Sequence, residues 1–390
     1  MAIVILGDLF TFPDGSAATN RVHTYAKGFY ENGLKVHVIC FASEYNTVGS
    51  GIINGINFYH PFGQRKRNKY FIIRRWQKFI KYFKTIAVIR RINKNDKIIA
   101  FICYTRLLQT QLFVFILSKY FKTNVILERS EHPLRNYQGF FIRKIQGDIK
   151  SYMETVLCNG IYCISQYLID FYRNRGVSLK KLFLVPSTVD IDRFQISFNS
   201  PLAFQYILYC GSLTILKDGV NILIESFGKI SEKYPEINLV LVGKGDTIEE
   251  EKIIKDLVIR LNFNKKIFFT GKLSRTEIPA YLNNAKILAL ARPRSIEADA
   301  GFPSKLTEYL ATGKPVIVTK VGEIPVYLKD NENAFLSEPD SVDAFADKLD
   351  YVLSNYEFAQ RVGEKGKELT KTIFNYNFQA ERMIGFIQSL

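Results

Sequence analysis

The chain has 390 residues, of which 47% are hydrophobic and 23% are charged. This composition is typical of a globular protein and excludes a disordered one, while the length favours two domains. The 53 lysines and arginines exceed the 37 acidic residues and give a formal net charge of +16. A chain this basic indicates an anionic partner, such as nucleic acid, a membrane or a phosphorylated substrate.

From the sequence we expect neither a targeting segment nor a membrane-spanning segment. No basic region followed by a cleavage site opens it, so we expect no signal peptide. The longest apolar stretch, residues 107–117, is too short to cross a bilayer and predicts a core helix. The cysteines lack the spacing of metal ligands or disulfides: Cys40, Cys103, Cys158, Cys163 and Cys210. They indicate buried, reduced thiols in a cytoplasmic protein.

Short β-branched runs alternate with amphipathic helices along the chain, and this order predicts parallel α/β sheets. The pattern starts at residues 2–6, passes through a loop that ends near residue 18 into a helix, and continues with predicted strands at 35–41, 98–104, 125–127, 161–164 and 182–185. It starts again at residue 205, with a strand at 205–210, a loop at 211–219, a helix, and predicted strands at 237–242, 267–270, 287–291 and 316–319.

Residues 192–204 lack this periodicity and predict a linker. We therefore predict two doubly wound, Rossmann-like α/β domains, at residues 1–192 and 205–370, that face one another across a cleft. Sheets of this kind bind ligands beyond the carboxyl ends of their strands. The strand-to-helix loops should therefore carry the chemistry.

The segment Gly301-Phe-Pro-Ser-Lys-Leu-Thr-Glu308 is the most informative of these loops. Ser304 is a plausible N-cap after a Gly/Pro turn, so a helix N-terminus would offer free amides and the positive dipole end to a phosphate. Lys305 adds a full charge, and Glu308, one turn along, can accept hydrogen bonds from a sugar diol. The alternative is that Glu308 is an ordinary surface residue.

The loop Gly211-Ser-Leu-Thr-Ile-Leu-Lys-Asp-Gly219 opens the first helix of the second domain. Lys217 at this position can neutralise a leaving diphosphate, and the two glycines let the backbone approach it closely. A solvated loop lysine is the alternative. The loop has neither a Walker A pattern nor the dinucleotide fingerprint, which argues against a kinase-type or NAD-binding site.

A third loop, in the first domain, places Gly15 and Ser16 just before the first helix. Small residues there favour an anion-binding nest at the helix N-terminus. A plain turn into the helix is the alternative.

Together these loops resemble the family 4 glycosyltransferases, which are retaining enzymes with the GT-B architecture. The resemblance covers both halves and rests on the order and spacing of short motifs: Asn32-Gly-Leu-Lys-Val-His-Val, Val185-Pro-Ser-Thr-Val-Asp190, Lys217-Asp-Gly-Val, Leu241-Val-Gly-Lys-Gly and Glu308-Tyr-Leu-Ala-Thr-Gly-Lys-Pro-Val-Ile. It implies that Lys217 binds the donor diphosphate and that Glu308 holds the nucleotide ribose. It also implies that the Gly15/Ser16 loop approaches the diphosphate and the acceptor. The C-terminal helix, residues 371–390, would pack back on the first domain.

Two positions depart from the family pattern. Ser212 stands where the family has an arginine, so one diphosphate cation is missing, and Lys305 is the candidate to replace it. Ala300 stands where the family has a glutamate, and Glu297 and Asp299 lie just upstream in what could be a lengthened loop. Backbone amides of the segment that follows can contact the sugar hydroxyls instead.

The resemblance also implies a first-domain histidine at the donor sugar. His132, in Glu128-Arg-Ser-Glu-His-Pro, is the best placed of the four, because His23, His37 and His60 look like helix, strand and turn residues. A loop histidine without a function is the alternative. The neighbouring Glu128 and Glu131 can equally well be solvated.

Residues 65–97 combine many cations with aromatic side chains, and Asp96 is the one acid among them. A helix there, apolar on one face and cationic on the other, can lie in an anionic membrane interface. The residues predicted to face the membrane are Arg74, Arg75, Trp76, Lys78, Phe79, Lys81 and Phe83. A core-packed helix with a solvated basic face is the alternative. No nucleic-acid module accompanies the charges, so we predict no nucleic-acid partner.

These observations predict a glycosyltransferase that moves a sugar from a UDP- or GDP-sugar to a hydroxyl of a glycan or lipid-linked glycan, in bacterial surface polysaccharide assembly. Retention is implied by the resemblance alone. We expect no metal and no cofactor besides the nucleotide sugar, and a location on the inner face of the cell membrane. The predicted catalytic residues are Lys217, Glu308 and His132, and the predicted donor-binding residues are Gly15, Ser16, Gly211, Ser212, Lys217, Gly301, Phe302, Pro303, Ser304, Lys305 and Glu308.

Two other functions fit the same residues. An epimerase or a phosphorylase on this fold would also need Glu308 and a phosphate grip, since a fold does not fix a function. A non-enzymatic basic protein that binds membrane or nucleic acid would need neither.

Overall fold

The computed structural model describes residues 1–15, 17–41, 49–62, 68–133, 141–196 and 198–390, and for 141–146 the backbone alone. The chain divides into two compact units. Unit 1 holds Met1–Thr188 and Tyr376–Leu390, and unit 2 holds Val189–Asn375. The predicted boundary at residue 192 therefore lies inside unit 2, where the short helix η3 (Ile191–Phe194) belongs.

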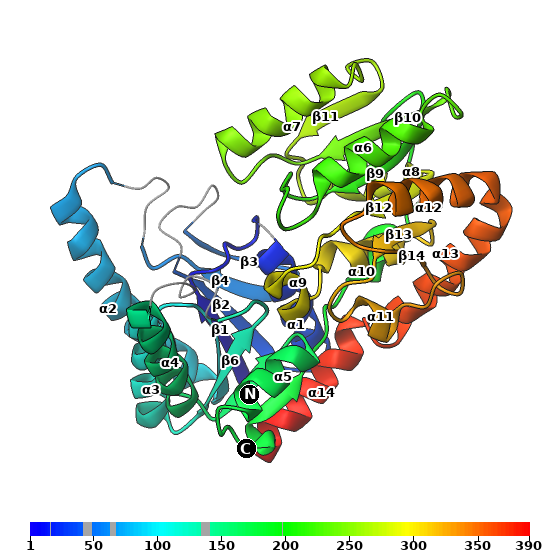
Figure 1. The fold of residues 1–390 in the computed structure, drawn as a ribbon. Coiled ribbons are helices and arrows are strands. Elements are labelled where there is room, and N and C mark those ends of the chain that lie inside the picture. Colours follow the sequence, from blue (N-terminus) through cyan, green and yellow to red (C-terminus); the bar gives the residue numbers. More distant parts are fainter. Residues whose placement is uncertain (16, 42–48, 63–67, 134–140, 197) are drawn as a thin grey trace. The chain divides into compact units, whose positions relative to one another are not determined.

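Unit 1 is built on one sheet with the strand order β3-β4-β2-β1-β5-β6-β7-β8 (Figure 1). Its strands are β1 (Ala2–Gly7), β2 (Lys35–Cys40), β3 (Ser50–Ile53), β4 (Ile56–Tyr59), β5 (Ile98–Tyr104), β6 (Asn124–Arg129), β7 (Gly160–Cys163) and β8 (Leu182–Leu184). Among the described residues the neighbouring strands pair in parallel, except β3 with β4. Every residue of β1 is buried, because helices cover both faces of a parallel sheet.

The helices of unit 1 are α1 (Ala17–Glu31), α2 (Phe71–Asn95), α3 (Leu108–Phe121), α4 (Phe141–Val156), α5 (Gln166–Arg173), η2 (Leu179–Lys181) and α14 (Tyr376–Ser389). The predicted core helix at 107–117 is thus α3. A core cluster joins side chains of the sheet, of α1 and of α14.

The C-terminal helix α14 packs against α1. Gly28 of α1 permits the contact, because a Cβ there would lie 2.5 Å from the Cβ of Ala380. The hydroxyl of Tyr376 donates to Glu31 Oε2 at 2.8 Å, and the hydroxyl of Tyr162 donates to the Met383 carbonyl at 3.1 Å. The last segment of the chain therefore completes the core of the unit with which the chain begins.

Unit 2 contains a sheet with the order β11-β10-β9-β12-β13-β14, and its neighbouring strands pair in parallel within the described residues. The strands are β9 (Gln205–Cys210), β10 (Ile237–Val242), β11 (Ile267–Gly271), β12 (Ile287–Leu290), β13 (Val316–Thr319) and β14 (Phe335–Ser337). The helices besides η3 are α6 (Val220–Ile230), α7 (Ile248–Arg260), α8 (Ile278–Asn284), α9 (Ile296–Ala300), α10 (Ser304–Ala311), α11 (Ile324–Tyr327), α12 (Val342–Ser354) and α13 (Tyr356–Lys371).

The strand order of each sheet reverses next to its first strand. β1 lies between β2 and β5, and β9 lies between β10 and β12. At such a switch point the loops that follow the two strands diverge to opposite faces and leave a crevice for a ligand. In unit 2 the loops after β9 and β12 are therefore the expected ligand site.

The predicted doubly wound α/β architecture is confirmed, but β3, β4 and β14 were not predicted. The β3–β4 hairpin turns at Asn54-Gly55, where both residues have positive φ (49° and 79°). Asn-Gly is the strongest short-range signal for such a turn, so the sequence did contain the information. β14 spans three residues, too few to show a period.

The cysteines and the helices can also be compared with what the sequence predicted. All five cysteines are buried and free, as predicted. Among the described helices, none combines the length and the apolar composition that crossing a bilayer would require.

The packing of α14 generates a stability prediction. Met383 is fully buried in the core of unit 1, and Met383→Ala should destabilise the protein by about 2–5 kcal/mol, because the truncation leaves a cavity. The exposed Gln388 on the same helix is the matched control, and Gln388→Ala should change stability by less than about 0.5 kcal/mol. Urea unfolding measures both. Equal midpoints would contradict the role assigned to α14.

Candidate functional site

Two glycines let the loop after β9 approach its neighbours closely. Gly219 caps the N-terminus of α6 with a φ of 66°, and a Cβ there would lie 1.9 Å from the carbonyl oxygen of Ala291, just after β12. A Cβ on Gly211 would lie 2.3 Å from Nζ of Lys305. Any other residue would clash, so the glycines bring the loop after β9, the end of β12 and the start of α10 together.

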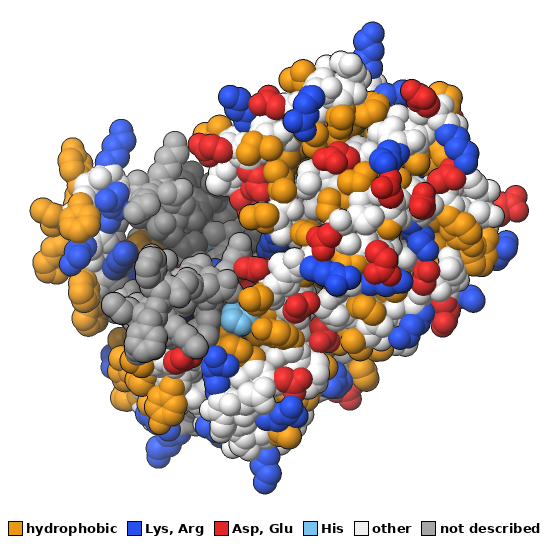
Figure 2. All heavy atoms as spheres, in the orientation of Figure 1, with side chains coloured by type: hydrophobic (Ala, Val, Ile, Leu, Met, Phe, Trp, Pro, Cys, Tyr) orange, Lys and Arg blue, Asp and Glu red, His pale blue; other side chains and the backbone are white. Residues whose placement is uncertain are grey.

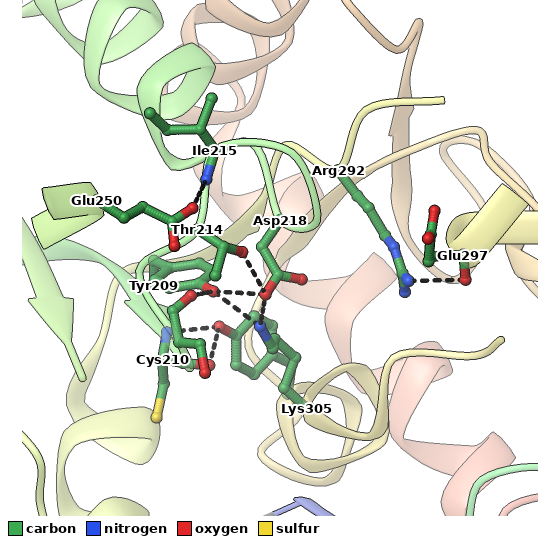
Figure 3. Close-up of polar contacts among 11 residues, drawn as sticks. Tyr209, Cys210, Thr214, Ile215, Asp218, Glu250, Arg292, Glu297 and Lys305 are labelled. Carbon is green, nitrogen blue, oxygen red and sulfur yellow. Dashed lines mark hydrogen bonds and ion pairs between the residues drawn. The ribbon is translucent and has the colours of Figure 1, made fainter. Parts of the chain in front are cut away.

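The carboxylate of Asp218 is the centre of this arrangement (Figure 3). Its side chain is buried, and Oδ2 accepts a hydrogen bond from Lys305 Nζ at 2.7 Å and lies 3.1 Å from the Tyr209 hydroxyl. The hydroxyl of Thr214 donates to the same oxygen at 3.4 Å. Lys305 Nζ also donates to the Tyr209 hydroxyl at 2.8 Å. The ion pair thus joins the loop after β9 to the first turn of α10.

Burial and the neighbouring charges have opposite effects on the pKa values of Asp218 and Lys305. Burial favours the neutral form of Asp218, but Lys305 and Arg292 more than compensate, and the pKa of the carboxyl lies below its usual value. Burial lowers the pKa of Lys305, although Asp218 partly offsets this effect. Lys217 acts on both groups. Three cations therefore act on the Asp218 carboxylate.

Arg292 directly follows β12 and is almost completely buried. One terminal nitrogen donates to the Glu297 carbonyl at 3.1 Å, while Nε has no hydrogen-bond acceptor in the described part of the chain. Burial lowers the pKa of this guanidinium, and Asp218 opposes the shift. A buried N–H without an acceptor is costly in a folded protein, so its presence at a ligand-binding edge suits an anionic ligand.

The start of α10 differs from the prediction. Ser304 is the first helical residue and not the N-cap; Pro303 holds the cap position and offers no side-chain hydrogen bond. The N-terminal amides of α10 consequently receive no side-chain cap. The Phe302 ring packs against Tyr327 and Phe374, with centroids 5.6 and 5.4 Å away. Gly301, Phe302 and Pro303 are buried, so contact with a donor could come from their backbone but not from the Phe302 side chain.

Glu308 lies in an ion pair that the sequence did not indicate. Its Oε1 accepts from a terminal nitrogen of Arg193 at 2.6 Å, and the other terminal nitrogen of Arg193 donates to the Arg275 carbonyl at 2.9 Å. Both partners keep 12% of their side-chain surface exposed. Glu308 is therefore held in place by η3 and is not the unpartnered surface residue of the alternative interpretation.

The region upstream of Gly301 is the short helix α9 instead of a lengthened loop. Ser295 caps it by accepting from the Ala298 amide, and Ala300 is buried. The Glu297 backbone carbonyl is used by Arg292, and Asp299 is exposed. No three His, Cys, Asp or Glu side chains come together as possible metal ligands in the described ranges.

In unit 1 the predicted anion-binding loop comprises Gly15 and Ser16. A Cβ on Gly15 would lie 2.1 Å from Thr19 Oγ1 and 2.5 Å from Thr11 Oγ1, so packing of the two threonines accounts for the glycine. Ser16 lies outside the described residues.

His132 lies beyond the end of β6 and is largely buried, with its ring 5.1 Å from that of Phe171. The neighbouring Glu128 is not solvated: it accepts from Arg21 Nε at 2.7 Å and from the Tyr25 hydroxyl at 3.0 Å, and all three side chains are buried. Glu131 pairs with Arg106. Glu128 thus belongs to the core of unit 1.

The predicted membrane-facing residues need one correction. Trp76, Phe79 and Phe83 are 66%, 64% and 71% exposed, and Arg75 and Lys78 are exposed too, with Arg74 half-buried. Lys81 is buried, however, with Nζ near the ring centroids of Phe41, Phe62 and Tyr82: 4.8, 5.1 and 5.0 Å away. Burial lowers its pKa to about 8. The helix turns Lys81 toward the domain, so this residue does not face a membrane.

Unit 2, which holds Asp218, Lys305 and Glu308, is similar in sequence to a known family. Residues 190–369 match the family described as Glycosyl transferases group 1. Unit 2 is therefore similar to these enzymes. An uncharacterised glycosyltransferase of Methanocaldococcus jannaschii is 28% identical over 168 residues, which are 43% of this chain and 44% of that protein.

A second relative carries a more specific name. The GDP-mannose-dependent alpha-(1-6)-phosphatidylinositol monomannoside mannosyltransferase of Mycobacterium tuberculosis is 25% identical over 235 residues, 58% of this chain and 60% of that protein. The chain thus spans only about 40–60% of the length of the curated relatives it matches.

Solved structures match the whole chain. Sucrose-phosphate synthase of Thermosynechococcus elongatus has a TM-score of 0.73 at 16% identity and covers 100% of this chain and 98% of its own. Anabaena HepE in complex with UDP-glucose has a TM-score of 0.72 at 14% identity, with complete coverage of both chains. The predicted GT-B fold is confirmed.

The Asp218–Lys305 pair generates a prediction about stability and pH. Lys305→Met removes the main cation that lowers the pKa of Asp218, so the buried carboxylate should cost about 3–5 kcal/mol at neutral pH. In the native protein the pKa of Asp218 is lower than in the unfolded chain, so the ionised carboxylate stabilises the fold at pH values above its unfolded-state pKa. This stability is lost as pH falls through the pKa of Asp218 in the folded state. In the variant burial raises the pKa, so the loss should shrink as acid protonates Asp218.

Thermal unfolding between pH 4.5 and 8 measures the effect. The double variant Asp218→Asn/Lys305→Met should recover part of the loss at neutral pH, because it buries no unpaired charge. A pH-independent loss without recovery in the double variant would contradict the coupling.

Proposed function

We propose that this protein transfers a glycosyl group from a nucleoside diphosphate sugar to a hydroxyl group of a glycan or lipid-linked glycan. The observation that carries the proposal is the cluster of Lys217, Arg292 and Lys305 around one carboxylate at the β9/β12 switch point. The cluster lies in the unit that matches the glycosyltransferase family. Fixed cations at such a crevice suit a diphosphate.

Departure of the nucleoside diphosphate builds negative charge that these cations can stabilise. Lys305 is already positioned by Asp218 and Tyr209, so it needs little reorganisation when the charge develops. The uncapped N-terminus of α10 adds amides and the positive end of a helix dipole. Ser212 occupies the position at which the family has an arginine, and in this proposal Lys305 and Arg292 together replace that arginine. Transfer is proposed to proceed without a metal ion.

Glu308 is proposed to hold the ribose of the donor. Arg193 donates to its Oε1 at 2.6 Å and therefore orients the carboxylate from η3. Its anchor on the Arg275 carbonyl fixes the pair from a third segment of unit 2.

The sugar end of the site is proposed to differ from the family pattern. Ala300 is buried and offers no carboxylate, so backbone groups of residues 301–304 are proposed to bind the sugar. His132 keeps, as a proposal, the role at the donor sugar that the family resemblance implies. The family resemblance supports retention of the anomeric configuration, in which the acceptor hydroxyl attacks from the face that the diphosphate leaves.

The relatives support the substrate classes. The Mycobacterium tuberculosis enzyme is named for GDP-mannose and for a phosphatidylinositol mannoside acceptor, and HepE was solved with UDP-glucose. A UDP- or GDP-sugar is therefore the proposed donor, and a lipid-linked glycan of surface polysaccharide assembly, at the inner face of the cell membrane, is the proposed acceptor. A thermal-shift screen of nucleotide sugars identifies the base and sugar, because a ligand bound by the folded state alone raises its stability.

The proposal predicts the effects of two substitutions. Lys217→Ala should lower the rate of sugar transfer by roughly 10²–10³-fold, the cost of removing one electrostatic contact to the developing charge. Glu308→Gln should mainly weaken donor binding, by about 10- to 100-fold, since a charge-assisted hydrogen bond is worth roughly 1.5–3 kcal/mol. Steady-state kinetics and donor titrations measure both.

Lys265→Ala, at an exposed lysine of the same unit, is the matched control and should keep full activity. Full activity of both site variants would show that the assignment is wrong. Product analysis with and without acceptor distinguishes transfer from an epimerase, which would convert the donor alone, and from a phosphorylase, which would require phosphate.

A further inference from the structure

Helix α2 packs on unit 1 through an unusual face. The side chains it buries are Lys81, Thr85, Ile89 and Ile92. At about 100° per residue these four lie within roughly 80° of one another on the helix. Three of them lie in the second half, so this half and Lys81 anchor the helix to the domain.

The aromatic and aliphatic side chains of the first half lie on the opposite face. Ile72, Ile73, Trp76, Phe79, Ile80 and Phe83 are all exposed, and at about 100° per residue they fall within an arc of roughly 120°. The centre of this arc is about 180° away from that of the buried face. An amphipathic helix normally buries its apolar stripe, whereas α2 turns it outward. Figure 2 shows apolar and basic side chains gathered at this edge of the molecule.

Cations border and extend this outward stripe. Arg75 and Lys84 lie at its two edges, and Arg90, Arg91 and Lys94 continue the same face along the second half. All five are exposed, and the sequence of α2 contains no acidic residue. The outward face therefore changes from apolar with a cationic border to mainly cationic.

Neighbouring helices of unit 1 add apolar surface. α3 exposes Leu112, Ile116 and Tyr120, at intervals of four residues, and Tyr120 lies beneath the Arg90 guanidinium of α2 at 5.9 Å. α2 and α3 also meet through Tyr82 and Phe113, whose ring centroids are 4.5 Å apart. The outward face of α2 is thus continuous with an exposed apolar stripe of α3.

We propose that the outward face of α2 binds the surface of an anionic lipid bilayer. The stripe around Trp76, Phe79 and Phe83 enters the boundary between headgroups and acyl chains, and the bordering arginines and lysines contact the anionic headgroups. Trp is enriched at this boundary because its ring is amphipathic. The proposal goes beyond sugar transfer and does not depend on it, since no residue of α2 is assigned to the donor site.

Charge decides between a bilayer and other occupants of this face. A second copy of the chain docked through the same patch by a two-fold axis would bring the two sets of cations together without acids to pair them. A nucleic acid would use the cations but would leave Ile72, Ile73 and Ile80 without a partner, because aliphatic side chains do not stack on bases as aromatic ones do. An anionic bilayer satisfies both the charges and the apolar stripe.

Trp76 makes the proposal directly testable, because it is the single tryptophan of the chain and lies in the stripe. Adding phosphatidylcholine vesicles that contain phosphatidylglycerol should shift its emission to shorter wavelength, and lipids brominated on the acyl chains should quench it. Vesicles of phosphatidylcholine alone should produce a much smaller shift. An emission that stays unchanged with the anionic vesicles would overturn the proposal.

Substitutions separate the two parts of the face. Phe79→Ser/Phe83→Ser should abolish the spectral shift, and each of Arg75→Gln and Lys84→Gln should weaken vesicle partitioning by about fivefold. Ile248→Ser, at an apolar side chain of α7 that is 85% exposed, is the control and should bind like the native protein. All of these side chains are exposed, so the variants should keep the native melting temperature.

The alternative occupants give distinct outcomes. A spectral shift that grows with protein concentration in the absence of vesicles would indicate a second copy and overturn the proposal, as would a shift produced by an RNA oligonucleotide but not by vesicles. Failure of vesicle binding with intact nucleotide-sugar binding would remove the membrane proposal and leave the proposed function in place. The reverse result would remove the proposed function alone.

Discussion

The carboxylate of Asp218 is buried, and a buried charge must have a partner in the folded protein. Lys305 supplies the partner, and the pair holds the loop after β9 against the first turn of α10. Because Gly211 and Gly219 let these segments approach, the cation is fixed without strain at the edge of the sheet. Much of the geometry of unit 2 at its switch point follows from this one contact.

Several cations gather near the same buried carboxylate. Lys217, Arg292 and Lys305 all act on Asp218, and Arg292 keeps a buried N–H that no described acceptor satisfies. Stabilisation of these groups by an anion is the physical basis of the proposed donor site. Arg193 plays a parallel role for Glu308, which it orients from η3.

In unit 1 the main feature is the packing of α14 and α2 on the rest of the unit. Its core is completed by α14 from the end of the chain, which packs against α1 through Gly28 and places Met383 and Phe386 in the interior. α2 packs on the same unit with a face that includes a lysine, and so leaves its aromatic face outside. A water-exposed stripe of large apolar side chains is unfavourable in an isolated domain, and the proposed bilayer contact removes that cost.

The alternation of strands and helices and the repetition of that pattern can be predicted from the sequence alone, as can the loop position of Lys217 and the helix that begins near Lys305 and carries Glu308. These properties follow from local periodicity and turn chemistry. The partners of these side chains depend on the tertiary structure, because Lys305 meets Asp218 across 87 residues and Glu308 meets Arg193 across 115. It also decided which face of α2 is buried. Periodicity shows which residues share a face of a helix, but the neighbouring elements determine which face the fold covers.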